Sequence, residues 1–259
     1  MMSLGIMQGR LCPTNFKNLN TFPKNWLSEF RELEKIGFKY IELLYDRKQS
    51  KLNPLSKKDG DLKKLLKHTQ NKVYSINLDY FTKNYIFNKI DKNKKLLKKI
   101  INIANKLKIK IIVIPCIEEN LMTNKNLIKF IKILKGMIYN KYPSISLEIN
   151  SLNKTVLKEF NNKVGICYDT GNIAVESQTY LRDLNQNLKK INHIHLKDKI
   201  KKNNLFFNCR LGKGIVNLKK IFSILKNKKY KGSITLETAI GKMPLAEAKK
   251  NFKIASKYI

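Results

Sequence analysis

The sequence predicts a single domain, residues 1–259, folded as one (β/α)8 TIM barrel with parallel strands. Short apolar segments of strand length alternate with longer amphipathic stretches from one end of the chain to the other. Parallel neighbouring strands need crossover helices, which the amphipathic stretches supply. No linker rich in Pro, Gly or Ser divides the chain, and 259 residues is a usual length for one such barrel.

Eight segments have the length and apolar content of strands. A doubly wound open sheet is the alternative arrangement, but the G-x-G-x-x-G motif that would mark it after the first strand is absent. The predicted strands cover residues 4–8, 40–44, 73–78, 110–115, 145–149, 164–169, 191–197 and 233–237.

The stretches between these strands have helical periodicity. Apolar residues recur at near-helical spacing across residues 86–107 and again across residues 127–138. Thr123 suits the N-cap of the second of these helices, and Pro244 suits the first turn of the last helix. The alternation of strand and helix therefore continues to the C-terminal part of the sequence.

The charge of the chain is strongly positive, with 53 Lys and Arg residues against 19 Asp and Glu, a formal net charge of +34. Such a balance is typical of proteins that bind nucleic acid. Here, however, nearly all the positive residues are Lys, and they are spread through every helical stretch instead of forming one stripe with aromatic residues. We therefore expect a solvated basic surface and no specific nucleic-acid partner.

The four cysteines are far apart and form no C-x-x-C pair, which predicts a reduced, cytoplasmic protein without a zinc ribbon or redox motif. No segment has the apolar length needed to span a bilayer, and the first ten residues lack the features of a signal peptide. We expect no membrane partner. An assembly of identical subunits is compatible with the sequence.

Four predicted strands end in a side chain that can bind a metal ion: Glu148, Asp169, His195 and Glu237. Side chains alternate between the two faces of a strand, so all four can point into the barrel while the intervening apolar residues pack outward. In such barrels the chemistry takes place where the strands end. Three carboxylates and one imidazole favour Mn²⁺, with Mg²⁺, Co²⁺ and Zn²⁺ as further candidates.

Each of these residues alone has a simpler interpretation, because a Glu at a strand end is most often a solvated or ion-paired residue. Four ligand types at four strand ends are what favour a metal site. His193 shares the inward direction of His195 but lies one layer deeper, so we expect it to form hydrogen bonds behind the ligands.

Short motifs at the predicted strands occur in a fixed order along nearly the whole chain. They are GIMQGRL at 5–11, GFKYIEL at 37–43, LDYF at 78–81, LE at 147–148, YDTGN at 168–172, HIHLKD at 193–198, RLGKG at 210–214 and LET at 236–238. In order and spacing these motifs resemble the xylose isomerase-like TIM barrels, specifically the sugar phosphate isomerase/epimerase family. The resemblance implies that Glu148, Asp169, His195 and Glu237 hold the metal. It also implies that Glu148 and Glu237 move a carbon-bound proton through an enediolate, as their residue types allow.

Three further residues are predicted to contact an anionic or polar part of the substrate. Asn172 stands where many epimerases of the family have a histidine, and it cannot act as a proton shuttle. Lys197 points inward by strand alternation, and Arg210 lies in the loop after the seventh strand, so both can bind a carboxylate or phosphate. The Gly212-Lys213-Gly214 turn can place backbone N–H groups near an anion.

Strand alternation also places Gln8, Glu42 and Asp79 at the barrel mouth, where we expect them to line the substrate pocket. Glu42 and Asp79 have an alternative interpretation as ion-pair partners of neighbouring lysines. His68, in an amphipathic helical stretch, is expected to be exposed.

The sequence thus predicts a metal-dependent isomerase or epimerase of carbohydrate metabolism that acts on a small-molecule sugar or sugar phosphate. The alternative on the same metal site is a dehydratase or lyase of a polyol ketone, in which the enediolate expels a hydroxyl. A third class is DNA repair by an endonuclease IV-like enzyme, which uses several histidines to bind three zinc ions. The chain has only three histidines, so this class is the least favoured.

Overall fold

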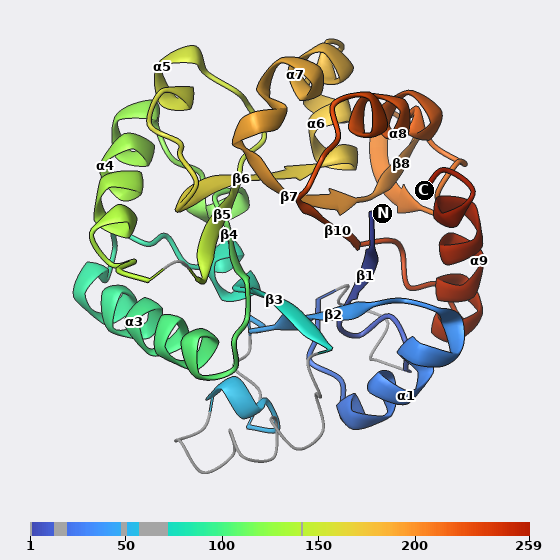
Figure 1. Cartoon of the computed structure of the whole chain (residues 1–259), viewed down its shortest axis with the longest axis horizontal. Coiled ribbons are helices and arrows are strands. Elements are labelled where there is room, and N and C mark those ends of the chain that lie inside the picture. Colours follow the sequence, from blue (N-terminus) through green and yellow to red (C-terminus); the bar gives the residue numbers. More distant parts are fainter. Residues whose placement is uncertain (1, 13–19, 48–50, 57–71, 141) are drawn as a thin grey trace.

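A computed structural model describes residues 2–12, 20–47, 51–56, 72–140 and 142–259. Eight parallel strands close into a barrel, in the order β1-β10-β7-β6-β5-β4-β3-β2, and helices surround it (Figure 1). The predicted barrel is confirmed; the assignment of all 259 residues to one domain stays a prediction. The barrel strands are β1 Leu4–Met7, β2 Tyr40–Leu44, β3 Val73–Asn77, β4 Ile111–Pro115, β5 Ser144–Glu148, β6 Val164–Asp169, β7 Ile191–Leu196 and β10 Ser233–Leu236.

The helices follow the strands as the periodicity predicts, and two start signals are confirmed. The Thr123 side chain accepts a hydrogen bond from the Asn126 N–H, and Pro244 lies in the first turn of α9. The helices are α1 Trp26–Ile36, α3 Ile90–Lys106, α4 Asn124–Lys135, α5 Lys154–Leu157, α6 Thr170–Glu176, α7 Tyr180–Asn187, α8 Leu218–Asn227 and α9 Pro244–Ser256. Short 3₁₀ turns are η1 Pro54–Ser56, η3 Asp79–Lys83, η4 Glu118–Asn120 and η5 Leu188–Lys190.

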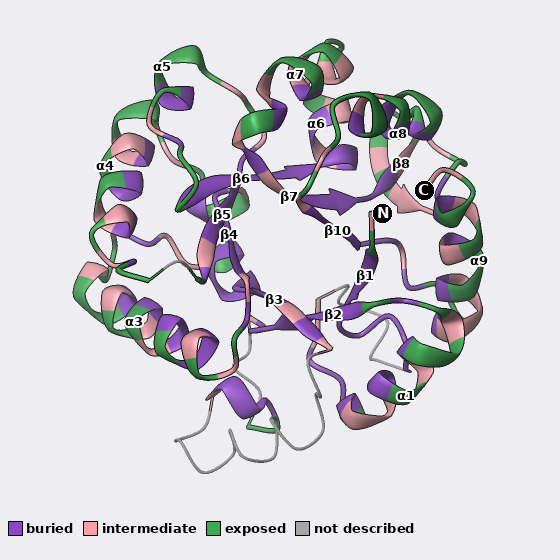
Figure 2. Cartoon of the chain, viewed as in Figure 1, coloured by how far each residue is buried: buried purple, intermediate pink, exposed green. Residues whose placement is uncertain are grey.

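The barrel strands are buried on both faces, because helices cover the outside and side chains fill the inside (Figure 2). The outward residues predicted for the strands, such as Leu147, Tyr168 and Ile194, are completely buried in the layer between strands and helices. The inward residues alternate with them. Polar side chains can therefore gather inside the barrel at the ends of the strands.

A two-stranded antiparallel hairpin, which was not predicted from the sequence, follows β7. It consists of β8 Asp198–Lys202 and β9 Leu205–Cys209. The two turn residues, Asn203 and Asn204, both have positive φ angles, 47° and 60°. This is the backbone of the tight turns that suit hairpins, and Asn tolerates it better than most residues.

Within the described residues, no helix has the length and apolar character needed to cross a membrane. His68 lies outside the described residues, so its predicted exposure stays a prediction.

Candidate metal centre and active site

The four residues predicted to bind metal converge. One ligand atom from each of Glu148, Asp169, His195 and Glu237 lies within 4.8 Å of the corresponding atoms of the others, and all four residues are buried. They come from the C-terminal ends of β5, β6, β7 and β10, which are consecutive neighbours around the barrel. Strand pairing places Asp169 beside His195, so the cluster is built by the register of the sheet.

A cavity of about 560 Å³ opens at this end of the barrel. Of the residues predicted to bind substrate or metal, five line it: Asp79, Glu148, Asn172, Lys197 and Glu237. Gln8, Glu42 and Arg210 are not among its described lining residues.

Asp169 is oriented by the helix that follows it. As the N-cap of α6, its Oδ1 accepts hydrogen bonds from the N–H groups of Gly171, at 2.9 Å, and Asn172, at 2.8 Å. These bonds fix the carboxylate. The other oxygen, Oδ2, faces the cluster.

His195 is held between carboxylates on its two sides. Its Nε2 lies 2.9 Å from Glu42 Oε1, whereas Nδ1 lies 3.0 Å from Glu237 Oε2 and 3.8 Å from Glu148 Oε2. A proton on Nε2, donated to Glu42, leaves the Nδ1 lone pair directed at the cluster. A carboxylate behind a ligating histidine commonly fixes the tautomer in this way.

Glu42 is not among the described residues that line the substrate cavity, and its ion-pair partners in the described structure are the histidines His193 and His195. The side chain is completely buried on β2, and its Oε2 lies 2.7 Å from His193 Nε2 and accepts a hydrogen bond from Ser75 Oγ at 2.6 Å. Burial raises the pKa of Glu42, but the nearby His195 and His193 lower it by a larger amount. The net shift of this pKa is therefore downward. Glu42 is therefore an ionised support for the two histidines.

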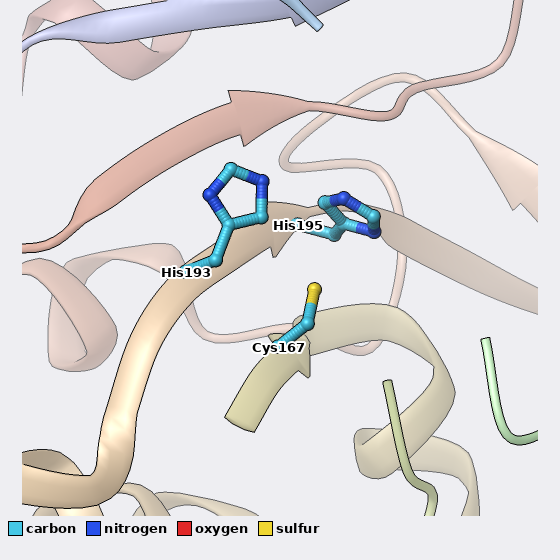
Figure 3. Close-up of side chains that lie close together, drawn as sticks. All are labelled: Cys167, His193 and His195. Atoms are coloured by element: carbon cyan, nitrogen blue, oxygen red, sulfur yellow. The ribbon is translucent and has the colours of Figure 1, made fainter. Parts of the chain in front are cut away.

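Behind the cluster, Figure 3 shows His193 and His195 projecting from the same strand, with the Cys167 sulfur directed toward them from β6. His193 Nδ1 lies 2.6 Å from Ser233 Oγ and so is part of the polar layer under the cluster. Burial raises the pKa of the Cys167 thiol to about 12. A neutral, buried thiol is a poor metal ligand, so the carboxylate-rich cluster is the better candidate for an ion.

The two glutamates of the cluster have different electrostatic surroundings. Burial and repulsion from Glu237 raise the pKa of Glu148 to about 8, and the Asn172 side chain donates a 3.0 Å hydrogen bond to Glu148 Oε1. Burial also raises the pKa of Glu237, but Lys197 and His195 lower it more, so it stays well below its usual value. Lys197 Nζ lies 2.7 Å from Asp169 Oδ2 and 3.1 Å from Glu237 Oε2.

The donor set fits a divalent cation. Three of its inward atoms, Asp169 Oδ2, His195 Nδ1 and Glu237 Oε2, are buried without an aligned hydrogen bond within the described structure. Three buried carboxylates repel one another unless positive charge lies between them. The Lys197 ammonium supplies part of that charge, and a metal ion would supply the remainder.

Asp79 lines the cavity, and its partners among the described residues are Arg47 and Asn20. Its carboxylate pairs with Arg47 Nε at 2.9 Å and accepts a hydrogen bond from the Asn20 side chain at 2.9 Å. Asn20 also accepts a hydrogen bond from Arg10 and lies 3.5 Å from Glu237. Asn20 and Arg47 were not predicted from the sequence, because no motif marks them and their roles depend on the folding of loops distant in the sequence.

Arg210 and the glycine turn, both predicted to contact an anion, lie against carboxylates of the chain itself. Arg210 forms a bidentate ion pair with Glu247 of α9, at 2.9 and 2.6 Å, so its guanidinium is already occupied. The Gly214 N–H donates to an anion within the chain, the Asp198 carboxylate, at 2.9 Å.

Gln8 is completely buried, and its Oε1 accepts a hydrogen bond from the Leu44 N–H at 3.1 Å.

The sequence of residues 30–258 matches the model of the xylose isomerase-like TIM barrel family. The chain belongs to this family. The described fold agrees with that membership, since seven of the eight barrel strands lie within the matched residues.

Solved structures with the same fold cover essentially the whole chain. The IOLI protein, solved with a zinc atom, has a TM-score of 0.77 and 20% identity, over 100% of this chain and 99% of that one. The 3-keto-D-glucoside 4-epimerase YcjR from E. coli has a TM-score of 0.71 and 18% identity, over 100% of both chains. D-allulose 3-epimerase from a Methylomonas species, in complex with D-allulose, has a TM-score of 0.70 and 16% identity, over 100% and 97%. At these identities the likeness establishes the fold alone.

Among curated proteins, an inosose dehydratase from Geobacillus thermodenitrificans is 25% identical over 121 residues. The alignment spans 40% of this chain and 41% of that relative. The matched part is therefore less than half of either protein.

Proposed function

We propose that this protein is a divalent-metal-dependent isomerase or epimerase of a sugar or sugar derivative, with Glu148 and Glu237 as the proton-transferring pair. The convergence of Glu148, Asp169, His195 and Glu237 at the barrel mouth carries this proposal. Family membership and the epimerase structures with the same fold support it.

Glu148, Asp169, His195 and Glu237 would hold the ion. A bound divalent ion would polarise the substrate carbonyl and so make the adjacent carbon-bound hydrogen more acidic. Mn²⁺ is the ion we expect, because oxygen ligands with a single nitrogen suit it. Zinc and magnesium are the other ions to test, since structures of similar proteins contain them.

The two glutamates are suited to opposite roles in proton transfer. Lys197, with Arg10 3.9 Å from Glu237 Oε1, favours the ionised form of Glu237, which can take a proton from carbon. Glu148 comes from β5, separated from β10 by β6 and β7, and can return a proton to the intermediate. Two carboxylates placed at one substrate are a common arrangement for acid and base catalysis.

The cavity also suits a polyhydroxylated substrate. Amide side chains donate and accept hydrogen bonds, as the hydroxyl groups of a sugar require. Five asparagines line the cavity: Asn20, Asn77, Asn150, Asn172 and Asn208.

A dehydratase is the second candidate, favoured by the sequence similarity to inosose dehydratase. Both reactions begin when a carboxylate removes a proton next to a carbonyl. They differ in the next step, in which the intermediate either accepts a proton or loses a hydroxyl group as water.

Incubation of the Mn²⁺-loaded protein with ketoses and inososes in deuterium oxide tests the proposal. We expect metal-dependent incorporation of deuterium at the carbon beside the carbonyl, observed by NMR and mass spectrometry, with no loss of water. A product lighter by one water molecule would support the dehydratase. Turnover without deuterium incorporation would indicate a hydride shift and would remove the proton-transfer roles of both glutamates.

A further inference from the structure

The cations in the substrate cavity are not equivalent. Among its described lining residues, Arg47, Lys197 and Lys199 carry a positive charge. Arg47 is paired with Asp79 and Glu118, and Lys197 is paired with Asp169 and Glu237. Lys199 is the one cation of this described lining for which the structure shows no ion pair with a carboxylate.

The β8–β9 hairpin places Lys199 in the cavity together with Asn208. The two residues are directly opposite each other in the antiparallel register, so their side chains lie on the same face of the hairpin. Both line the cavity, and both are only partly exposed. The hairpin thus adds an ammonium and an amide to the wall of a cavity whose metal-binding residues come from the barrel strands.

The backbone at Lys199 is fixed by several contacts. The Asp198 carboxylate accepts hydrogen bonds from the N–H groups of Lys199 at 2.9 Å, Gly214 at 2.9 Å and Val216 at 3.1 Å. The Ile215 N–H donates to the Lys199 carbonyl at 2.9 Å. A Cβ on Gly214 would lie 2.2 Å from that carbonyl oxygen, so the close approach requires glycine. Little backbone ordering is then needed when a ligand binds.

Lys199 also differs from the many surface lysines of this chain. Burial and the neighbouring Lys197 lower its pKa by more than the carboxylates of Asp169, Glu237 and Glu148 raise it. The pKa of Lys197 is raised, so the Lys199 ammonium is the less stabilised of the two. A negatively charged ligand group would supply that stabilisation. The net charge of +34 also attracts small anions toward the molecule at long range.

We propose that Lys199 and Asn208 form an anion subsite, and that the substrate is a sugar derivative carrying a phosphate or carboxylate group. The inference rests on the proposed function, because it assigns a substrate class to the same cavity. A lysine ammonium binds either anion as a compact charge, and the Asn208 amide can donate an additional hydrogen bond. The subsite takes the role that the sequence had suggested for Arg210.

Isothermal titration of the Mn²⁺-loaded protein with D-fructose, D-fructose 6-phosphate and D-fructuronate tests the subsite. We expect one of the two anionic sugars to bind about 10- to 100-fold more tightly than D-fructose, the range of a charge-assisted hydrogen bond. The tighter of the two identifies the anion as phosphate or carboxylate. Equal affinity for all three sugars would overturn the inference.

Variants of the hairpin supply the matched controls. We expect Lys199→Met to remove most of the preference for the anionic sugar, Asn208→Ala to reduce it less, and both to leave metal content unchanged. Lys202→Met changes an exposed lysine of the same strand, outside the described cavity lining, and should have no effect. An unchanged preference in Lys199→Met, or an equal loss in Lys202→Met, would contradict the subsite.

The two proposals fail in different ways. If the subsite is wrong, metal-dependent deuterium incorporation continues with neutral sugars and does not depend on Lys199. If the reaction is wrong, the Lys199-dependent preference for an anion persists, but no sugar in the panel exchanges its carbon-bound hydrogen.

Discussion

The two ends of the barrel carry cavities of similar size and opposite character. The cavity at the C-terminal end, about 560 Å³, is lined by five carboxylates and three cations. The cavity at the N-terminal end, about 660 Å³, is lined by five lysines, and none of its described lining residues is a carboxylate. Volume therefore does not indicate which end carries the chemistry.

The arrangement of the charges, unlike the volume, indicates which end of the barrel carries the chemistry. At the N-terminal end four of the lysines are exposed, and Lys110 lies 4.2 Å from the centre of the Tyr142 ring. At the C-terminal end five of the eight charged lining residues are buried, and Lys197 among them lies 2.7 Å from the Asp169 carboxylate. Buried charges cost free energy unless they are compensated, so their concentration at one end indicates a functional site.

Substitutions at the two ends of the barrel should differ most in their effect on turnover. Glu148→Gln and Glu237→Gln should each lower turnover about 10²- to 10⁴-fold, because an amide can neither donate nor accept the transferred proton at neutral pH. Lys229→Met, at the N-terminal cavity, should leave turnover unchanged. Steady-state kinetics on the metal-loaded proteins measures all three, and full activity in either Gln variant would remove its acid or base role.

Glu29 is a buried carboxylate near the C-terminal end of the barrel, and its titration measures how much free energy of unfolding is lost when such a group ionises. This residue of α1 accepts hydrogen bonds from the N–H groups of Gly9 and Leu11, and burial raises its pKa from 4.5 to about 7. The folded state then binds more protons than the unfolded state between these pH values. Glu29 should therefore lower the free energy of unfolding by about 3 kcal/mol as pH rises from 4.5 to 7.

Urea unfolding of the wild type and Glu29→Gln at pH 5 and pH 8 measures this effect. The Gln oxygen can still accept both N–H groups but does not titrate. The variant should gain stability relative to the wild type between pH 5 and pH 8. An identical pH dependence in the two proteins would show that Glu29 does not titrate in this range.

Glu42 lies behind the predicted metal ligands, and its substitution measures how much a residue in this position contributes to metal affinity. Glu42→Gln removes the negative charge between His193 and His195 and weakens the orientation of His195. We expect a loss of metal affinity of about 10- to 100-fold, as is typical when such a partner is changed. Competition with a chelating dye measures it, with circular dichroism to confirm folding; unchanged affinity would mean that Glu42 only fills the barrel.

The smallest effects should be at the N-terminal end. Lys110→Met combined with Lys229→Met should change metal affinity and turnover less than about twofold, within the range usual for surface substitutions.

Duplex DNA should bind weakly, and the binding should disappear at physiological salt. A large loss of activity in the double variant, or duplex binding that survives salt, would assign a function to the lysines of this end.

The sequence predicted most of the barrel because strand periodicity is a local property. All eight predicted strands are present within about a residue at their ends, and alternation correctly placed Glu148, Asp169, His195 and Glu237 on the inner face. The substrate contacts were predicted less well. Strand alternation shows that the Glu42 side chain points into the barrel. Its contacts with His193 and His195, which keep it from the substrate cavity, are visible only in the closed barrel.

Contacts between distant segments explain the other differences. Arg210 pairs with Glu247, a partner 37 residues away that no local pattern indicates. The hairpin had a local signal, Asn203-Asn204 between two short alternating segments, but the basic residues around it obscured the strand pattern. Lys199 and Asn208 were missed with it.

Anomalous diffraction from crystals grown with Mn²⁺ tests the proposed metal site, because it locates the ion without assuming a substrate. We expect one strong peak at the C-terminal end of the barrel, within bonding distance of Glu148, Asp169, His195 and Glu237, and its loss in crystals of Asp169→Asn. An ion bound elsewhere, or no peak among these four side chains at saturating Mn²⁺, would contradict it.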